Sequence, residues 1–343
     1  MRKNRSSLIF TILFGLLLLS ALLLGCGSSD LAAVPQELLP SGTSESVDVS
    51  VSWLIENNQN EDGGYGVDFE TGEPASAPAS TLDAIMAIAS GGFDPDTPYE
   101  DRLLTPIIYL SNNVDDLSKF AEGTGGNAGK VILALVAANQ DTSDFAAINW
   151  VQILMDQYSS TGQFNTPDAF NQSLAIMALT AVDEPVPQAA MEWLKDQQSS
   201  DGSWGDGFGT EQNADTTAIS IMAMVAAGSP SDDLTLTRGL EFLAESQLPT
   251  GGWEYGPGFG ENANSTALVV QALAATGSNY YEDDGPWGKN GHSPLTALLN
   301  WKNSTGAFQA DFGQGPFDDF FSTAQAIPAA AGKPLPLPPW DLR

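Results

Sequence analysis

A polar segment that could carry acid chemistry stands directly before an apolar stretch of the chain. Residues 213–217, "NADTT", run into "AISIMAMVAAG". A carboxyl group beside an apolar site can act as a general acid when burial raises its pKa, so Asp215 is the candidate catalytic residue. Asp, Asn, Ser and Thr are also preferred helix N-caps, because their oxygens accept otherwise unpaired backbone N–H groups. Both interpretations stay open for this segment.

The same polar-to-apolar pattern recurs along the chain. "NANSTALVVQALAATG" begins at Asn262, and four further copies begin at residues 80, 127, 171 and 322. Successive copies lie 44–57 residues apart, a spacing typical of repeat proteins. Each copy contains one alanine at an equivalent position: Ala87, Ala134, Ala178, Ala223, Ala272 and Ala329.

An amphipathic helical segment, such as residues 187–198, precedes each copy, and in five copies a glycine-aromatic turn joins the two. A helix that is apolar on all sides must be buried on all sides, whereas an amphipathic helix lies outside it. We therefore predict an all-α fold, an α6/α6 toroid of six helical hairpin repeats, with an open solenoid as the alternative. The turn aromatics are Tyr65, Phe164, Trp204, Trp253 and Phe308.

Parallel inner helices would bring their N-termini together at one mouth of such a toroid. Their positive dipole ends and free N–H groups can hold a polar or anionic ligand group. Polar residues at the helix starts would form a ring around this mouth, although a repeated cap would give the same pattern. The predicted ligand-binding residues are Ser80, Asn127, Asn171, Asp215, Thr216, Asn264, Ser265 and Ser322, with Trp204 and Trp253 as a possible aromatic lining.

The N-terminal segment indicates export and lipidation. A basic start is followed by an apolar run over residues 8–24 and then by "GC", which is the charge pattern of a secretion signal. "LLGC" resembles the lipobox of bacterial lipoproteins, which implies a lipidated Cys26 and an extracytoplasmic protein anchored to a bacterial membrane. An uncleaved membrane helix is the alternative. The predicted segments are a signal peptide (1–25), lipidated Cys and linker (26–47), toroid (48–333) and C-terminal tail (334–343).

Charge and composition exclude several classes of partner and cofactor. The chain carries 43 acidic and 12 basic residues, a net charge of −31, and such a field repels nucleic acid. A single cysteine and a single histidine, Cys26 and His292, disfavour a disulfide framework and a histidine-based zinc site. We expect no metal or cofactor. Calcium in the acidic loops 60–73 and 280–287 is a minor alternative, because these loops lack the EF-hand spacing.

The repeats resemble a known family. "WLKDQQSSDGSW" (193–204) and "FLAESQLPTGGW" (242–253) are similar to the Gln-Trp motif of the prenyltransferase and squalene-cyclase α/α toroids. The resemblance covers residues 48–333 and is strongest to bacterial secreted members, which are similar to the helical domain of transcobalamin and intrinsic factor. In the first segment the matching residues are Gln198, Gly202 and Trp204.

Members of this family have several different activities. The resemblance implies that each activity would need its own set of residues in this chain. Protein prenyltransferases bind zinc through Asp, Cys and His, a set that this chain cannot assemble. The Asp-X-Asp-Asp acid motif of class II terpene cyclases would fall at residues 213–216, where only Asp215 matches. Cobalamin carriers hold their ligand against a second β-domain, so cobalamin binding would need a partner chain. A glycosidase or lyase would pair Asp215 with Asp168 or Glu211.

We therefore predict a membrane-anchored lipoprotein whose toroid binds a small molecule or a partner protein at its mouth. One alternative is a terpene cyclase or prenyltransferase-type enzyme of divergent mechanism. The other is a cobalamin-carrier-like half-site that needs a partner domain. The sequence leaves enzymatic activity open and favours a binding role, because both family motifs for catalysis are incomplete.

Overall fold

The computed structural model describes residues 38–68, 71–166, 168–207 and 212–340. All described residues belong to one compact unit. Within the described residues, no helix is both long and apolar enough to cross a membrane. The predicted signal peptide, its apolar run and Cys26 lie outside the described residues.

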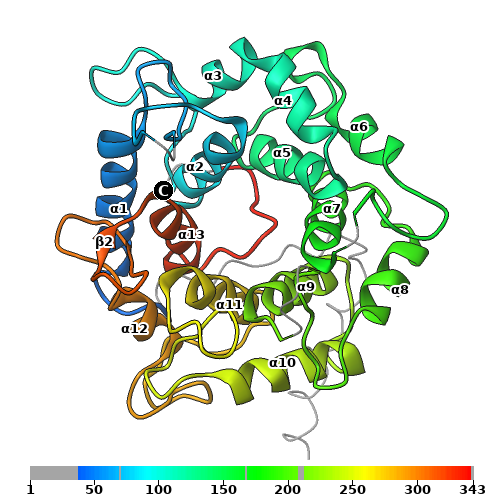
Figure 1. The fold of residues 1–343 in the computed structure, drawn as a ribbon, viewed down its shortest axis with the longest axis vertical. Coiled ribbons are helices and arrows are strands. Elements are labelled where there is room, and N and C mark those ends of the chain that lie inside the picture. Colours follow the sequence, from blue (N-terminus) through cyan, green and yellow to red (C-terminus); the bar gives the residue numbers. More distant parts are fainter. Residues whose placement is uncertain (1–37, 69–70, 167, 208–211, 341–343) are drawn as a thin grey trace, which may run out of the picture. The chain divides into compact units, whose positions relative to one another are not determined.

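The inner layer of this unit is a closed ring of helices (Figure 1). Each inner helix contacts the next one along the chain, and the last contacts the first. The aligned alanines are all buried, so small side chains allow neighbouring helices to approach closely. The inner helices among the described residues are α2 (Pro78–Ser90), α5 (Gly125–Ala137), α7 (Ala169–Ala181), α9 (Ala214–Ala226), α11 (Ala263–Ala275) and α13 (Phe320–Ala330).

Amphipathic helices surround this ring, as Figure 1 shows. They are α1 (Thr43–Asn58), α3 (Pro106–Asn112), α4 (Val114–Ala121), α6 (Trp150–Asp156), α8 (Gln188–Asp196), α10 (Leu234–Ser246) and α12 (Pro294–Leu299). A 3₁₀ turn (Phe145–Ala147) precedes α6, and a short antiparallel hairpin of β1 (Gln309–Ala310) and β2 (Phe317–Asp318) precedes α13. The predicted α/α toroid is thus confirmed. The count of six hairpin repeats stays a prediction, because two short helices, α3 and α4, occupy the second outer position.

The glycine-aromatic turn joins the outer helix of a repeat to its inner helix, and it also contacts the next outer helix. Gly202 has a φ of +93°, and a Cβ built on it would lie 2.2 Å from the Arg238 carbonyl oxygen, so only glycine fits this close approach. The Trp204 backbone N–H donates to Thr217 Oγ1 at 3.0 Å. Gln198 Nε2 donates to the carbonyl oxygens of Gly202 and Thr235. These contacts connect α8, α9 and α10.

The other turns repeat this arrangement. In each, the backbone N–H of the aromatic residue donates to a polar side chain in the first turns of the following inner helix. A ring of equivalent hydrogen bonds therefore sets the spacing between the turns and the inner layer. The pairs are Tyr65 with Thr81, Phe164 with Gln172, Trp253 with Thr266 and Phe308 with Thr323.

Both ends of the toroid differ from the predicted boundaries. Helix α1 begins at Thr43, five residues inside the predicted linker, and Val47 is buried. Of the predicted tail, residues 334–340 are described, and they pack at the end of the ring where the inner helices finish. There Leu335 and Leu337 are buried, and the Trp340 N–H donates to the Ala137 carbonyl at 2.9 Å. Proline has no N–H to leave unpaired, so "KPLPLPPW" can lie against an apolar surface at little cost.

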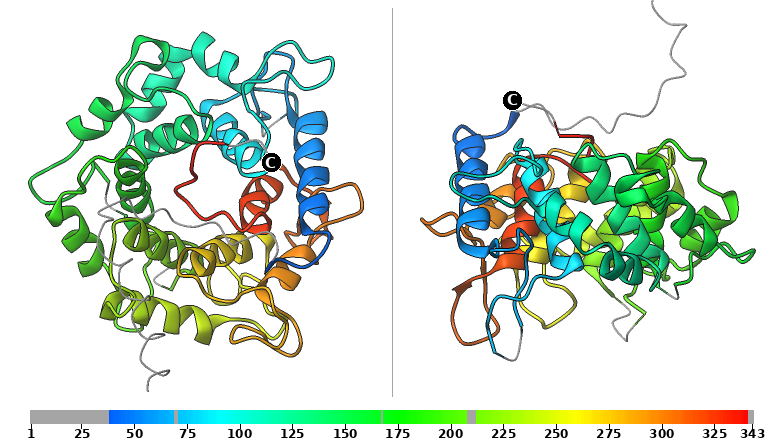
Figure 2. Two further views of the ribbon diagram at one scale, coloured as in Figure 1. Left: turned by 180° about the vertical axis from the view of Figure 1, so that it is seen from behind. Right: turned by 90° about the horizontal axis from the view of Figure 1, so that it is seen from above.

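Figure 2 shows the ring from behind and from its edge. In the edge view, the red C-terminal segment lies at one face of the ring. The loops that lead into α2 and α13 extend from the opposite face. The two mouths of the ring therefore have different coverings.

Candidate functional site

A cavity of about 270 Å³ lies inside the ring of inner helices. Every inner helix contributes to its wall, and Leu335 from the tail closes the end at which the inner helices finish. The lining residues are Ala79, Asp83, Met86, Phe120, Gly126, Asn127, Lys130, Phe170, Asn171, Leu174, Ile219, Leu268, Gln271, Ala324, Gln325, Pro328 and Leu335.

In every inner helix, the residue at the same equivalent position faces this cavity. It is the residue four places before the aligned alanine. Residues at i, i+4 and i+7 share a helix face, so the positions one turn away on either side also contribute. We call this set the facing column, and it consists of Asp83, Lys130, Leu174, Ile219, Leu268 and Gln325.

The polar column predicted from the sequence lies three residues earlier, and most of it is not at the cavity. Of its members, Asn127 and Asn171 line the cavity. The other members are buried and do not line the cavity, and their contact with a ligand stays a prediction: Ser80, Thr216, Ser265 and Ser322.

The helix caps are also displaced from the positions that we predicted. Asn213 Oδ1 accepts the Thr216 N–H at 2.7 Å, and Asn262 Oδ1 accepts the Ser265 N–H at 2.8 Å. In every inner helix except α2, whose N-cap is Ala77, the capping side chain stands three residues before the polar-column residue. Neither Asp215 nor Asn264 is an N-cap, and their side chains are left for other contacts.

Trp204 and Trp253 do not line the cavity, contrary to the expected aromatic lining. Both side chains have no exposed surface. Their indole N–H groups donate to the Leu194 and Leu243 carbonyls, each at 2.8 Å. A buried indole needs such a partner, so these residues hold outer helices to the ring.

Asp215 lies in the first turn of α9, on the same helix face as Ile219 of the facing column. Burial raises the pKa of Asp215 to about 6, and the neighbouring Ser265 hydroxyl lowers it in part. Among the described residues, neither Asp215 Oδ1 nor Ser265 Oγ forms a hydrogen bond of normal geometry. Asp215 does not line the cavity itself, and its carboxyl group with a raised pKa lies one helical turn before the cavity-lining Ile219.

Asp168 is not available as a second catalytic carboxylate. It is the N-cap of α7 and accepts the Asn171 N–H at 2.7 Å. Its oxygens also accept from Asn171 Nδ2 and from the Thr166 hydroxyl. Glu211, the other candidate partner of Asp215, lies outside the described residues. A two-carboxylate glycosidase site therefore has no support from Asp168.

The sequence interpretation missed the polar residues that do face the cavity. Lys130 Nζ lies 2.7 Å from Asp83 Oδ1 and 2.8 Å from Oδ2, an ion pair between α5 and α2. Gln271 is buried, and its Oε1 has no hydrogen-bond partner among the described residues. Gln325 Oε1 accepts from Asn264 Nδ2 at 2.8 Å. Each of these residues is a charged or amide residue in the middle of an otherwise apolar helix, and this pattern could have identified them from the sequence.

These residues divide the cavity wall into two halves. Gln325, Asp83 and Lys130 come from α13, α2 and α5, which are neighbours in the ring. We call them, together with Gln271 of α11, the polar half. The apolar half consists of Leu174, Ile219 and Leu268 from the neighbouring helices α7, α9 and α11.

The described residues hold no group of three or more His, Cys, Asp or Glu side chains that could bind a metal ion. The acidic loop 280–287 uses its polar groups internally. Asn279 Nδ2 donates to Glu282, and Asp283 Oδ1 accepts the Ser293 N–H. Asp283 has a lowered pKa, chiefly because of this backbone hydrogen bond.

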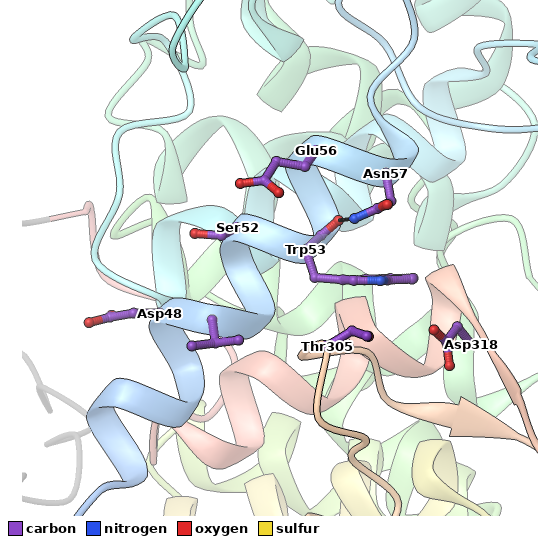
Figure 3. Close-up of a pocket in the computed structure, with 8 residues that line it drawn as sticks. Asp48, Ser52, Trp53, Glu56, Asn57, Thr305 and Asp318 are labelled. Carbon is purple, nitrogen blue, oxygen red and sulfur yellow. Dashed lines mark hydrogen bonds between the residues drawn. The ribbon is translucent and has the colours of Figure 1, made fainter.

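A second hollow, of about 520 Å³, lies on the outer surface between α1 and the β1–β2 hairpin (Figure 3). In this view the Trp53 indole lies over Thr305, with Asp318 near its far edge. The hollow follows the seam that closes the ring, where Ser50 Oγ donates to the Gly306 carbonyl at 2.7 Å. Its rim is largely exposed, so the central cavity is the stronger candidate site. The remaining lining residues are Asp48, Val49, Ser52, Glu56 and Asn57.

Comparison with known proteins agrees with this architecture. Residues 128–262 match the family model of the squalene-hopene cyclase C-terminal domain. The structure is similar to the type II terpene cyclase MstE from Scytonema, with a TM-score of 0.60 and 13% identity over 85% of this chain and 98% of that chain. No curated protein matches the chain by sequence.

Two further solved structures share the fold at low identity. A variant of MstE in complex with geranylgeranyl dihydroxybenzoate, its substrate, has a TM-score of 0.57 and 14% identity, covering 84% of this chain and 97% of that chain. Haptocorrin in complex with Cbi has a TM-score of 0.56 and 14% identity, covering 89% of this chain and 71% of that chain. The chain therefore has the α/α toroid fold of these proteins, and its matched segment resembles the squalene-hopene cyclase C-terminal domain.

Proposed function

We propose that the toroid binds a small, largely hydrocarbon molecule in its central cavity. The observation that carries this proposal is the facing column, which encloses one cavity with side chains from every inner helix. Three members of the column from neighbouring helices, Leu174, Ile219 and Leu268, contribute apolar side chains to the wall. Each CH₂ group that a ligand buries there is worth about 0.8 kcal/mol.

The size of the cavity limits the ligand. Its volume of about 270 Å³ lies just below the range of about 300–1,000 Å³ that is typical of small-molecule pockets. A compact isoprenoid or another branched hydrocarbon chain suits this space. The isoprenoid substrate of the similar Scytonema cyclase supports this ligand class.

The predicted lipid anchor agrees with such a ligand, because a protein held at a membrane meets molecules that partition into lipid. Extracytoplasmic anchoring through Cys26 therefore remains part of the proposal. Replacing Cys26 with Ser should release the protein from the membrane fraction and abolish incorporation of labelled fatty acid. Unchanged fractionation and labelling would contradict this part of the proposal.

Native mass spectrometry of the full-length protein from its own host tests the binding proposal. We expect a bound small molecule that is lost in the Leu174→Trp variant, because the larger side chain fills the apolar half. Leu234→Trp is the matched control, since Leu234 is 72% exposed on α10. Ligand-free protein in the wild type, or equal ligand in both variants, would contradict binding at this cavity.

Acid-catalysed cyclisation is the second candidate function, and Asp215 is the observation that favours it. A carboxyl group with a pKa of about 6 remains protonated in about a tenth of molecules at pH 7. Donation of this proton to an alkene would require a bound isoprenoid that extends past Ile219 to the first turn of α9, because Asp215 does not line the cavity itself. Product analysis after incubation with isoprenoids tests this function, and cyclised product from the wild type that Asp215→Asn does not form would support it.

A further inference from the structure

We infer that the polar half of the cavity selects an uncharged hydroxyl group on the ligand, so that the preferred ligands are alcohols. This inference rests on the proposed function of the cavity as a binding site for an apolar molecule. It assigns a specificity role to Gln271 and to the Asp83–Lys130 pair.

Polar and apolar residues line opposite sides of the cavity. Gln325, Asp83 and Lys130 stand on three neighbouring helices and face the apolar half across the cavity. A ligand made only of hydrocarbon would cover these groups without replacing their water. Covering a polar group in this way is costly unless a hydrogen bond compensates. The wall therefore favours a ligand with one polar edge.

The buried side chain of Gln271 offers a hydrogen-bond acceptor to a ligand. It lines the cavity on the same helix as Leu268, is 2% exposed, and its buried Oε1 has no partner among the described residues. Most buried polar atoms in folded proteins have a hydrogen-bond partner. An O–H group of the ligand would supply one. A hydroxyl both donates and accepts, so it satisfies either orientation of the carboxamide.

The local charges determine that the ligand group is neutral. Lys130 Nζ contacts both carboxylate oxygens of Asp83, so the two charges offset each other within the wall. A carboxylate or phosphate on the ligand would face Asp83 and the Gln271 oxygen, in a chain of net charge −31. An ammonium group would face Lys130. A hydroxyl meets neither repulsion, and it can contact both members of the pair.

Competition binding with three matched probes tests the inference. Farnesol, farnesoate and the corresponding C15 hydrocarbon would each displace a fluorescent apolar dye, N-phenyl-1-naphthylamine, from the full-length protein. We expect farnesol to bind about tenfold or more tightly than the other two, because only it can pair the buried oxygen. In Gln271→Leu we expect the preference over the hydrocarbon to fall to about twofold.

Thermal unfolding separates this role from a structural one. Gln271→Leu should keep or raise Tm, because it removes a buried atom that has no partner, and still lose the alcohol preference. Gln188→Leu, on the exposed face of α8, should change neither property. Lys130→Met combined with Asp83→Leu should also reduce the preference without removing hydrocarbon binding.

The outcomes separate this inference from the proposed function. Equal binding of farnesol and hydrocarbon by the wild type would overturn the alcohol preference while leaving the apolar site intact. An alcohol preference that persists in Gln271→Leu would overturn the role of Gln271. Failure of every probe to displace the dye would overturn both proposals.

Discussion

Asp83 and Lys130 form an ion pair inside the wall of the central cavity, with Nζ and Oδ1 2.7 Å apart. The pair joins two neighbouring inner helices, α2 and α5, and each side chain keeps only about a fifth of its surface exposed. Charges in such a position stabilise the fold only while both are present, because either one alone remains desolvated without a partner.

We therefore expect a strong coupling between these two residues. Lys130→Met or Asp83→Leu alone should lower the free energy of unfolding by about 1–3 kcal/mol, whereas the double variant should lie closer to wild type. Urea unfolding of the four proteins measures the coupling energy. The outer pair Lys195–Asp233, in which the lysine is 34% exposed, is the control and should give a coupling of about 0–1 kcal/mol. Equal coupling in both pairs would contradict a special role for the cavity pair.

The close approach at Gly202 gives a second prediction. Gly202→Ala should lower the free energy of unfolding by at least about 3 kcal/mol, because its Cβ would overlap the Arg238 carbonyl and its φ is positive. Gly228 is the matched control. It also has a positive φ, +79°, but a Cβ there meets nothing within 4 Å. Gly228→Ala should cost about 1 kcal/mol, and equal losses in the two variants would show that the turn tolerates a side chain.

The raised pKa of Asp215 predicts a pH dependence of stability. The folded protein holds this proton more tightly than the unfolded chain, so the stabilisation is complete below about pH 4 and is lost as the pH rises through about 6. Asp215→Asn removes the buried charge. It should raise the free energy of unfolding by about 2–3 kcal/mol at pH 7 and have little effect at pH 4.

Denaturant titrations of wild type and Asp215→Asn at pH 4, 5, 6 and 7 measure this difference. Asp156→Asn is a suitable control, because Asp156 is exposed at the end of α6. It should leave the pH profile unchanged. A difference between wild type and Asp215→Asn that does not grow between pH 4 and 7 would show that Asp215 is not buried as described.

The toroid could be predicted from the sequence because its pattern is repeated. The alignment on Ala87 and its counterparts identified the inner helices, since a fully apolar helix has only one place in such a fold. The facing residues could not be assigned with the same certainty. The polar column at Thr216 and the facing column at Ile219 lie less than one helical turn apart, and polarity alone does not show which of them lines the cavity.

The role of the tail could not be predicted for a different reason. Residues 334–340 have no helical period, and their proline content is equally typical of a free linker. Only the tertiary structure shows that Leu335 fills one end of the cavity and that the Trp340 N–H pairs with Ala137. Local sequence patterns do not report such a long-range contact.

The tail contact predicts an effect on binding as well as on stability. Leu335→Ala and Leu337→Ala each remove a buried leucine side chain, which costs about 2–4 kcal/mol of unfolding free energy. Only Leu335 lines the cavity. Leu335→Ala should therefore improve binding of a larger apolar probe relative to a smaller one, as measured by dye displacement, whereas Leu337→Ala should leave that ratio unchanged. Equal ratios would contradict the position of Leu335 in the cavity wall.

The central claim is that a hydrocarbon ligand occupies the space enclosed by the inner helices. Its most direct test is a titration of dye-loaded wild type, Leu174→Trp and Leu234→Trp with the C15 hydrocarbon probe, after confirming that all three are folded by circular dichroism. We predict displacement from wild type and Leu234→Trp, and a loss of affinity of at least about tenfold in Leu174→Trp, whose indole fills the apolar half. Equal affinity in all three proteins would show that the ligand binds elsewhere.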